Sequence, residues 1–216
     1  MAEVKGLYGA IFKGAAFLYH SALAFVATNT ITSLDDDFVT SGFTTSQKIT
    51  VYGSGVNDGD YTTATVSADT MTVSGAGIGD ETPTTSVMIY SSAPGTQVTG
   101  FYGWSITHNC QALDATDFAD VGVATYISGD EGWSATAQAH WMTDEDVESL
   151  IGTVLMCRFF VKYSASPSGG APVYLYEGAA VVTGISPEVK TDAIVERPLT
   201  FQGVGPLRYR SLSAYP

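Results

Sequence analysis

The sequence predicts an all-β protein with one short α-helix, whose strands build a sandwich or barrel. Charged residues make up only 14% of the chain, whereas apolar residues make up 45%. Short segments rich in Thr, Val and Tyr are separated by Gly- or Pro-containing turns, as is typical of β-sheets. In 133–141, apolar and polar residues alternate without a break. This alternation indicates a strand with one buried and one wet face.

The strand-like segments suggest two domains. A core domain is predicted from 1–20 and 87–216, with a small β module inserted at 21–86. Within the module, strands are expected at 47–52, 61–66 and 71–73, followed by a linker at 75–85. In the core domain, strands are expected within 4–19 and at 87–90, 103–112, 133–141, 154–163, 172–177, 179–183 and 194–201. Pro198 indicates an edge or bulge position in the last of these.

The predicted core contains three tryptophans, namely Trp104, Trp133 and Trp141. Trp133 and Trp141 share one face of their strand with three alanines, and Trp104 shares a face with Ile106.

A single helix is expected after residue 142. Thr143 is a suitable N-cap, and Asp146 stands where a capping box places an acidic residue. Val147, Leu150 and Ile151 give the helix one apolar stripe, and Gly152 is expected to end it.

Charge is distributed unevenly. The formal net charge is −13. Residues 109–150 carry nine acids and no Lys or Arg, whereas 190–216 carry four basic residues against two acids. An acidic chain repels nucleic acid and anionic membranes, so tight DNA binding is not expected. The basic end and the acidic middle could attract each other between subunits, or both could be ordinary solvated surfaces.

Cys110 and Cys157 are expected to be buried free thiols, because both lie in strand-like segments. No apolar stretch reaches the ~18 residues of a membrane span. Residues 15–27 are apolar enough to pass for a signal peptide, although Tyr19, His20 and Ser21 interrupt them. Secretion therefore remains an alternative at this stage.

The sequence predicts no enzyme activity, no metal site and no cofactor. His20, His108 and His140 have no metal-ligand spacing with one another or with Cys. The acidic run 35–37 lacks the pattern of a calcium loop, and 57–60 is explained by a hairpin turn. Neither a phosphate-binding loop nor a nucleophile elbow is present in the sequence.

From residue 98 onward the chain resembles the major tail tube proteins of long-tailed, siphophage-like bacteriophages. Five segments carry this resemblance in the expected order: 103–109 (GWSITHN), 113–118 (LDATDF), 129–135 (GDEGWSA), 177–186 (EGAAVVTGIS) and 199–207 (LTFQGVGPL). The capped helix also belongs to the pattern. Residues 38–73 resemble a second small β module met in phage virion proteins, through 41–43 (SGF), 49–54 (ITVYGS), 57–61 (NDGDY) and 71–73 (MTV).

The resemblance implies a structural virion protein. In that family, six subunits close a ring, and rings stack into a hollow tube that conducts DNA from the capsid to the host cell. It implies a virion location after assembly in the host cytoplasm. The implied partners are identical copies and the tape-measure, tail-terminator and baseplate proteins, with DNA passing transiently and no membrane contact.

The resemblance also suggests site residues. By analogy, a long loop at 113–132 would contact the next ring, and a basic segment would be its partner. Polar strand faces could line the lumen, or could be an ordinary solvated surface. The candidates for the stacking loop are Asp114, Thr116, Asp117, Phe118, Asp120, Asp130 and Glu131; those for the basic partner are Arg197, Arg208 and Arg210; and those for the lumen are Ser105, Thr107, Asn109, Gln111, Ser134, Thr136, Gln138 and His140.

Two alternative functions remain open from the sequence. One is a tail terminator, head–tail connector or distal tail protein. The other is a secreted β-sandwich binding module or adhesin.

Overall fold

The structure is a computed structural model and is all-β, which confirms the predicted fold class. It describes residues 11–13, 16–34, 38–75, 77–92, 96–98, 101–116, 123–141, 148–162, 173–189, 191 and 194–212. The chain forms two compact units. The first comprises 1–98, 155–177 and 209–216, and the second comprises 99–154 and 178–208.

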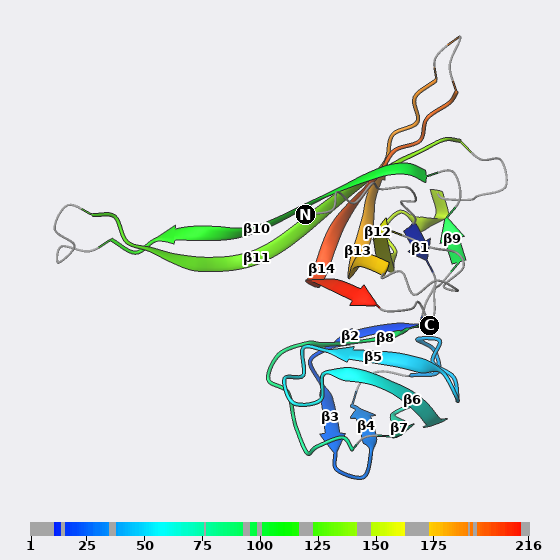
Figure 1. Ribbon diagram of the computed structural model, residues 1–216, viewed down its shortest axis with the longest axis vertical. Coiled ribbons are helices and arrows are strands. Elements are labelled where there is room, and N and C mark those ends of the chain that lie inside the picture. The colour runs from blue at the N-terminus through cyan, green and yellow to red at the C-terminus, as the bar shows by residue number, and fades with distance from the viewer. Residues whose placement is uncertain are drawn as a thin grey trace. The chain divides into compact units, whose positions relative to one another are not determined.

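A seven-stranded antiparallel sheet belongs entirely to the first unit (Figure 1). Its order is β2-β8-β5-β6-β7-β4-β3. The strands are β2 (Phe17–His20), β3 (Leu23–Val26), β4 (Thr30–Ser33), β5 (Lys48–Tyr52), β6 (Gly59–Val66), β7 (Thr70–Ser74) and β8 (Val87–Ser91).

Strict alternation explains why these short segments form a sheet. In β4 and β7, Ile31, Met71 and Val73 point inward and are at most 4% exposed, while the intervening threonines point outward. Period-two patterning of this kind fixes which face of each strand is buried. Phe38 and Phe43 close the core with an edge-to-face ring contact at 6.1 Å.

The seven-stranded sheet is larger than the module predicted from the sequence. Residues 17–20 and 87–91, which the sequence analysis assigned to the core domain, pair with each other and with β5 in this sheet. Leu18, Leu23 and Phe25 are at most 6% exposed, so the apolar run considered as a signal peptide contributes to a folded core.

A five-stranded sheet has the order β10-β11-β14-β13-β12. Its strands are β10 (Phe101–Asp114), β11 (Tyr126–Ala139), β12 (Val154–Lys162), β13 (Val173–Ile185) and β14 (Leu199–Leu212). β10, β11 and the middle of the sheet belong to the second unit, whereas β12 and the ends of β13 and β14 belong to the first. Two further strands, β1 (Ile11–Lys13) and β9 (Thr96–Val98), pair separately.

The alternating segment is a strand of the predicted kind. Trp133, Ala135, Ala137 and Ala139 are at most 3% exposed, and the residues between them are exposed. The Trp133 indole lies against Gly178 of β13 and Gly203 of β14, where an added Cβ would come within 2.7 and 2.4 Å of the ring. Its Nε1 donates a hydrogen bond to the Gly205 carbonyl at 3.1 Å.

Several expectations need correction. Trp141 is 41% exposed rather than buried, because β11 ends at Ala139. Cys110 is exposed, because its part of β10 lies outside the packed sheet, whereas Cys157 is buried as predicted. The last strand begins at Leu199, and Ile194 is 68% exposed.

The predicted helix falls largely outside the described residues. Its described part, Glu148–Leu150, is a single 3-10 turn. Ile151 bridges to Val182, and Gly152 has a φ of 78°, the left-handed conformation that Gly tolerates at such an end.

Candidate assembly surface and a buried ion-pair cluster

The outer halves of β10 and β11 form a two-stranded arm, defined here as residues 108–114 and 126–132. Their register runs from His108↔Trp133 to Asp114↔Tyr126. In the described sheet, β11 pairs with β14 over Ser134–Ala137, so the arm begins where β14 stops pairing. Figure 1 shows it as a ribbon that leaves the sheet. Seven residues per strand correspond to about 23 Å.

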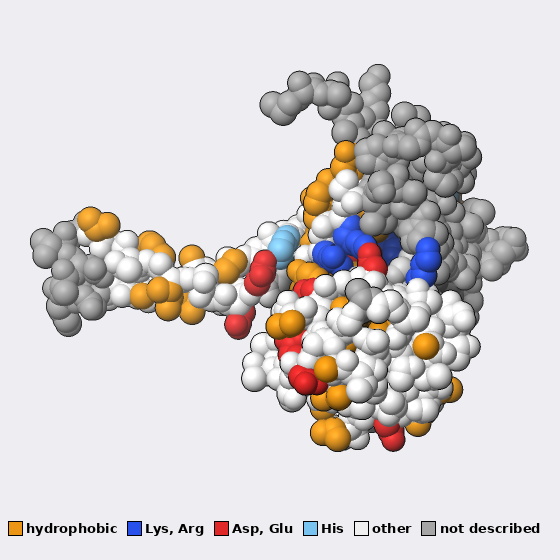
Figure 2. All heavy atoms as spheres, turned by 60° about the horizontal axis from the view of Figure 1, so that its bottom comes forward, with side chains coloured by type: hydrophobic (Ala, Val, Ile, Leu, Met, Phe, Trp, Pro, Cys, Tyr) orange, Lys and Arg blue, Asp and Glu red, His pale blue; other side chains and the backbone are white. Residues whose placement is uncertain are grey.

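The arm has little internal packing of its own. Each of its residues is exposed except Gly129, which is half-buried. Leu113, Tyr126 and Ile127 are 41%, 62% and 55% exposed. Leu113 and Ile127 stand directly opposite each other and therefore share a face. Figure 2 shows apolar side chains spaced along this surface.

The arm is acidic. No Lys or Arg occurs from Phe101 to Cys157. Asp114 accepts hydrogen bonds from the backbone and side chain of Thr116, which hold the pKa of Asp114 below its ordinary value. Glu131 lies 2.8 Å from His108 on the neighbouring strand. The surface therefore favours a partner that is apolar and neutral or basic.

The predicted stacking loop is mostly strand. Asp130 and Glu131 lie in β11, and Asp114 ends β10, so the connection is shorter than the expected 113–132. The glycines beside Asp130 and Glu131 look like turn residues in the sequence, but the ladder passes through them with one register shift between Cys110 and Ala112. Asp117, Phe118 and Asp120 lie outside the described residues.

The proposed lumen residues share a wet face of β10 and β11. Ser105 stands opposite Thr136, and Thr107 opposite Ser134. The Ser105 and Thr136 hydroxyls are hydrogen-bonded at 2.8 Å. Asn109, Gln111 and Gln138 are also exposed, whereas His140 is half-buried and stacks on Tyr102 with ring centroids 4.5 Å apart. The face is hydroxyl- and amide-rich and uncharged.

A shallow open groove of about 400 Å³ lies at the base of the arm. It is entirely within the second unit and is lined by Asn109, Cys110, Gln111, Asp130, Gly132, Trp133, Ser134 and Gln202. Gln202 donates a hydrogen bond to the Trp133 carbonyl at 3.1 Å where the two strands begin to separate.

Two of the three basic partner candidates are engaged inside the chain. Arg197 is 2% exposed, and its guanidinium lies 4.8 Å from the centre of the Trp141 ring. Arg210 pairs with Asp60 and Glu177. Arg208 is half-buried. These contacts argue against Arg197 and Arg210 as the partners of an acidic arm.

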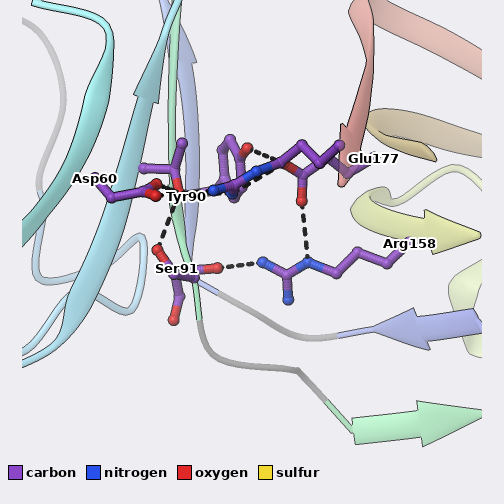
Figure 3. Close-up of polar contacts among 8 residues, drawn as sticks. Asp60, Tyr90, Ser91, Arg158 and Glu177 are labelled. Atoms are coloured by element: carbon purple, nitrogen blue, oxygen red, sulfur yellow. Dashed lines mark hydrogen bonds and ion pairs between the residues drawn. The ribbon is translucent and has the colours of Figure 1, made fainter. Parts of the chain in front are cut away.

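A buried ion-pair cluster in the first unit is the feature that sequence reasoning missed (Figure 3). Glu177 of β13, 1% exposed, lies 3.5 Å from the Arg158 Nε of β12 and 3.3 Å from the Arg210 Nη1 of β14. The Tyr90 hydroxyl of β8 donates to the same carboxylate. Arg158 also donates to the Ser91 carbonyl.

The cluster reaches solvent at Asp60. Arg210 donates to the Asp60 carboxylate at 2.8 Å and to the Thr50 hydroxyl at 3.2 Å. Burial lowers the pKa of Arg210, but the attraction of Glu177 and Asp60 outweighs burial and raises that pKa above its ordinary value. The four charged groups come from four strands that are far apart in the sequence, and their spacing gave no signal.

Among the described residues, no group of three or more His, Cys, Asp or Glu side chains is placed to hold a metal ion. In the same part of the chain, no helix has the length and apolar character needed to cross a membrane. The acidic run at 35–37 lies outside the described residues.

Comparisons with known proteins give limited information. No family model matches the sequence, and no curated protein is similar to it. A solved chain described as "Tail of empty GTA particle computed with helical refinement, C6 symmetry" matches with a TM-score of 0.43 and 16% sequence identity. The match covers 54% of this chain and 87% of that chain. A similarity of this extent establishes neither family nor function.

Proposed function

We propose that this protein is a non-enzymatic structural subunit of a phage tail, and that it forms the tail tube by assembling with identical copies. The sequence resemblance suggests the tube and its rings of six. The arm is the structural observation that supports assembly most directly.

An arm of this kind is costly to leave in water. Isolated two-stranded ribbons are marginally stable. Their free edges and exposed apolar side chains invite pairing with another chain. Covering Leu113 and Ile127 in an assembly would contribute on the order of 1.5–3 kcal/mol per fully buried side chain. Contacts with identical copies around a ring would satisfy every arm in a finite object.

The uncharged wet face suits a passage for DNA. DNA carries about one negative charge per 1.7 Å of its axis. A wall with Ser105, Thr107, Ser134 and Thr136 on it offers no cations to hold the phosphates. A net charge of −13 also disfavours retention.

The test is assembly of the purified full-length chain, observed by negative-stain electron microscopy and light scattering. The unaltered protein should form rings or hollow tubes. Leu113→Asp and Ile127→Asp should raise the concentration needed for assembly by at least about tenfold, the factor for 1.4 kcal/mol. Both variants should retain the β-sheet circular dichroism spectrum.

Val56→Asp is the matched control, because Val56 is 76% exposed and lies outside the arm, between β5 and β6. It should assemble like the unaltered chain. Single rings that never stack would favour a terminator instead. A chain that stays monomeric at high concentration would contradict the proposal.

A further inference from the structure

The buried cluster has two parts with different environments. The inner part joins Arg158 and Glu177, whose side chains are each 2% exposed. The outer part joins Arg210, with its side chain 11% exposed, to Asp60, whose side chain is 58% exposed. Arg210 contacts both parts, because its Nη1 reaches Glu177 and its Nη2 reaches Asp60.

The two parts respond differently to the loss of one member. If Arg158 or Glu177 were removed, an uncompensated charge would remain buried, which typically destabilises a protein strongly. If Arg210 were removed, Asp60 would be solvated at the surface, and Glu177 would still pair with Arg158 and accept from Tyr90. The outer pair can therefore open without leaving an unpaired buried charge.

The cluster also connects separate strands of the first unit. Arg158, Glu177 and Arg210 come from β12, β13 and β14. Thr50, Asp60 and Tyr90 come from β5, β6 and β8 of the seven-stranded sheet. Thr50 strengthens the outer pair by donating to Asp60 at 2.6 Å and lying 3.0 Å from the Ser92 hydroxyl. Tyr209, next to Arg210, has its ring 5.1 Å from that of Tyr176.

We propose that the cluster is a two-part clamp between the seven-stranded sheet and the ends of β12–β14. Its inner pair is permanent, and its outer pair, Arg210 with Asp60 and Thr50, opens and closes in the folded protein. This device is independent of the proposed tail function, because it concerns contacts within one chain. Opening would loosen the sheet from the C-terminal strands while both remain folded.

Native-state hydrogen exchange on the full-length chain, read by mass spectrometry, tests the clamp. Arg210→Gln should speed amide exchange about two- to fivefold in 48–62 and 209–212, the factor for a partly exposed ion pair. Exchange in 133–139, in the second unit, should not change. Asp60→Asn should have the same local effect, and the double variant D60N/R210Q should add nothing further.

Glu177→Gln tests the inner pair. It should raise the unfolding equilibrium constant by on the order of a hundredfold or more, as expected when a buried pair loses one partner. Lys48→Gln is the matched control, because Lys48 is an exposed cation two residues before Thr50 on β5. It should change neither local exchange nor stability.

Three results would overturn the clamp. R210Q might exchange like K48Q, in which case the outer pair holds nothing. R210Q might unfold the whole chain as E177Q does, in which case the outer pair does not open separately. E177Q might be as stable as K48Q, in which case the inner pair is not the permanent part.

Discussion

The indole of Trp133 fills a space that two neighbouring strands leave free by carrying glycine. An added Cβ at Gly203 would lie 2.4 Å from two atoms of the ring, closer than any real contact, and the ring is flanked on the other strand by Gly178. Because the ring also donates to the Gly205 carbonyl, it cannot move away without breaking that hydrogen bond.

Gly203→Ala should therefore lower the free energy of unfolding by about 1–3 kcal/mol, the usual cost of overpacking. Gly132→Ala, next to Trp133, is the control, because a Cβ there meets nothing within 4 Å. Its stability should change by no more than about 0.5 kcal/mol. Urea unfolding of both variants measures the difference, and equal stabilities would refute this account of the packing.

The two cysteines should differ in reactivity. Burial raises the pKa of Cys157 from its ordinary value of 9.0 to about 12, whereas Cys110 is exposed. Iodoacetamide at pH 8 should modify Cys110 in the native protein and leave Cys157 unmodified, because the thiolate is the reactive form. Mass spectrometry of peptides from the treated protein reads this directly, and rapid labelling of Cys157 would contradict its burial.

The same pKa shift gives a pH dependence. Below pH 9 the Cys157 thiol is protonated in both the folded and unfolded states, so it adds no slope. Between pH 9 and about 12 only the unfolded state loses the proton, and stability falls by up to about 1.4 kcal/mol per pH unit. Cys157→Val should remove this contribution from the urea-unfolding profile; identical profiles would contradict it.

At the residue scale, the sequence predicted burial only where alternation was unbroken. Trp133 begins the alternating run and is 2% exposed, whereas Trp141 ends it and is 41% exposed. The difference arises because the ladder stops at Ala139 and the Trp141 amide then bonds to the Val195 carbonyl. The end of a strand depends on its neighbour, which local patterning does not reveal.

Among the elements, the arm is the one that the rest of the fold needs least. Its residues pair with each other and are almost all exposed. Asn109 stands opposite Gly132, so a two-residue turn could join these positions. A chain in which Asn-Gly replaces residues 110–131 should keep its melting temperature within a few degrees but lose assembly.

Thermal unfolding and electron microscopy of this shortened chain test both halves of the prediction. A large fall in melting temperature would show that the arm stabilises the monomer. Tubes formed by the shortened chain would remove the arm from the assembly contacts.

The arm also shows why some elements escape sequence analysis. The segment 126–132 contains Gly129, Asp130 and Gly132, a composition typical of turns. Both of its faces are exposed, so no apolar alternation marks it as a strand. By contrast, β10 up to Ala112 and β12 were predicted almost to the residue, since each carries a strand pattern bounded by turn signals.

For the whole molecule, charge makes a prediction that needs no contact detail. With 22 acids against nine Lys and Arg, the chain should not retain duplex DNA even at low salt. A mobility-shift experiment at about 50 mM salt should show free DNA at every protein concentration. Salt-sensitive binding would mean that a local basic surface outweighs the net charge.

The fold class was predictable at this scale, because composition and turn frequency are properties of the entire chain. The division of strands between sheets was not. Tyr90 and Glu177 are 87 residues apart, yet the Tyr90 hydroxyl donates to the Glu177 carboxylate. Long-range pairing of this kind is determined by tertiary structure rather than by local propensity.

All seven strands of the larger sheet come from the continuous stretch 17–91, and the chain enters and leaves that stretch at adjacent points, where the Ser91 amide bonds to the Ala16 carbonyl at 2.8 Å. A direct splice between these two positions would span roughly one inter-strand spacing, about 5 Å. The excision would hand Arg158 and Glu177 to water, which solvates charges readily. Whole-module loss or exchange is thus open to this gene at the cost of a single short junction.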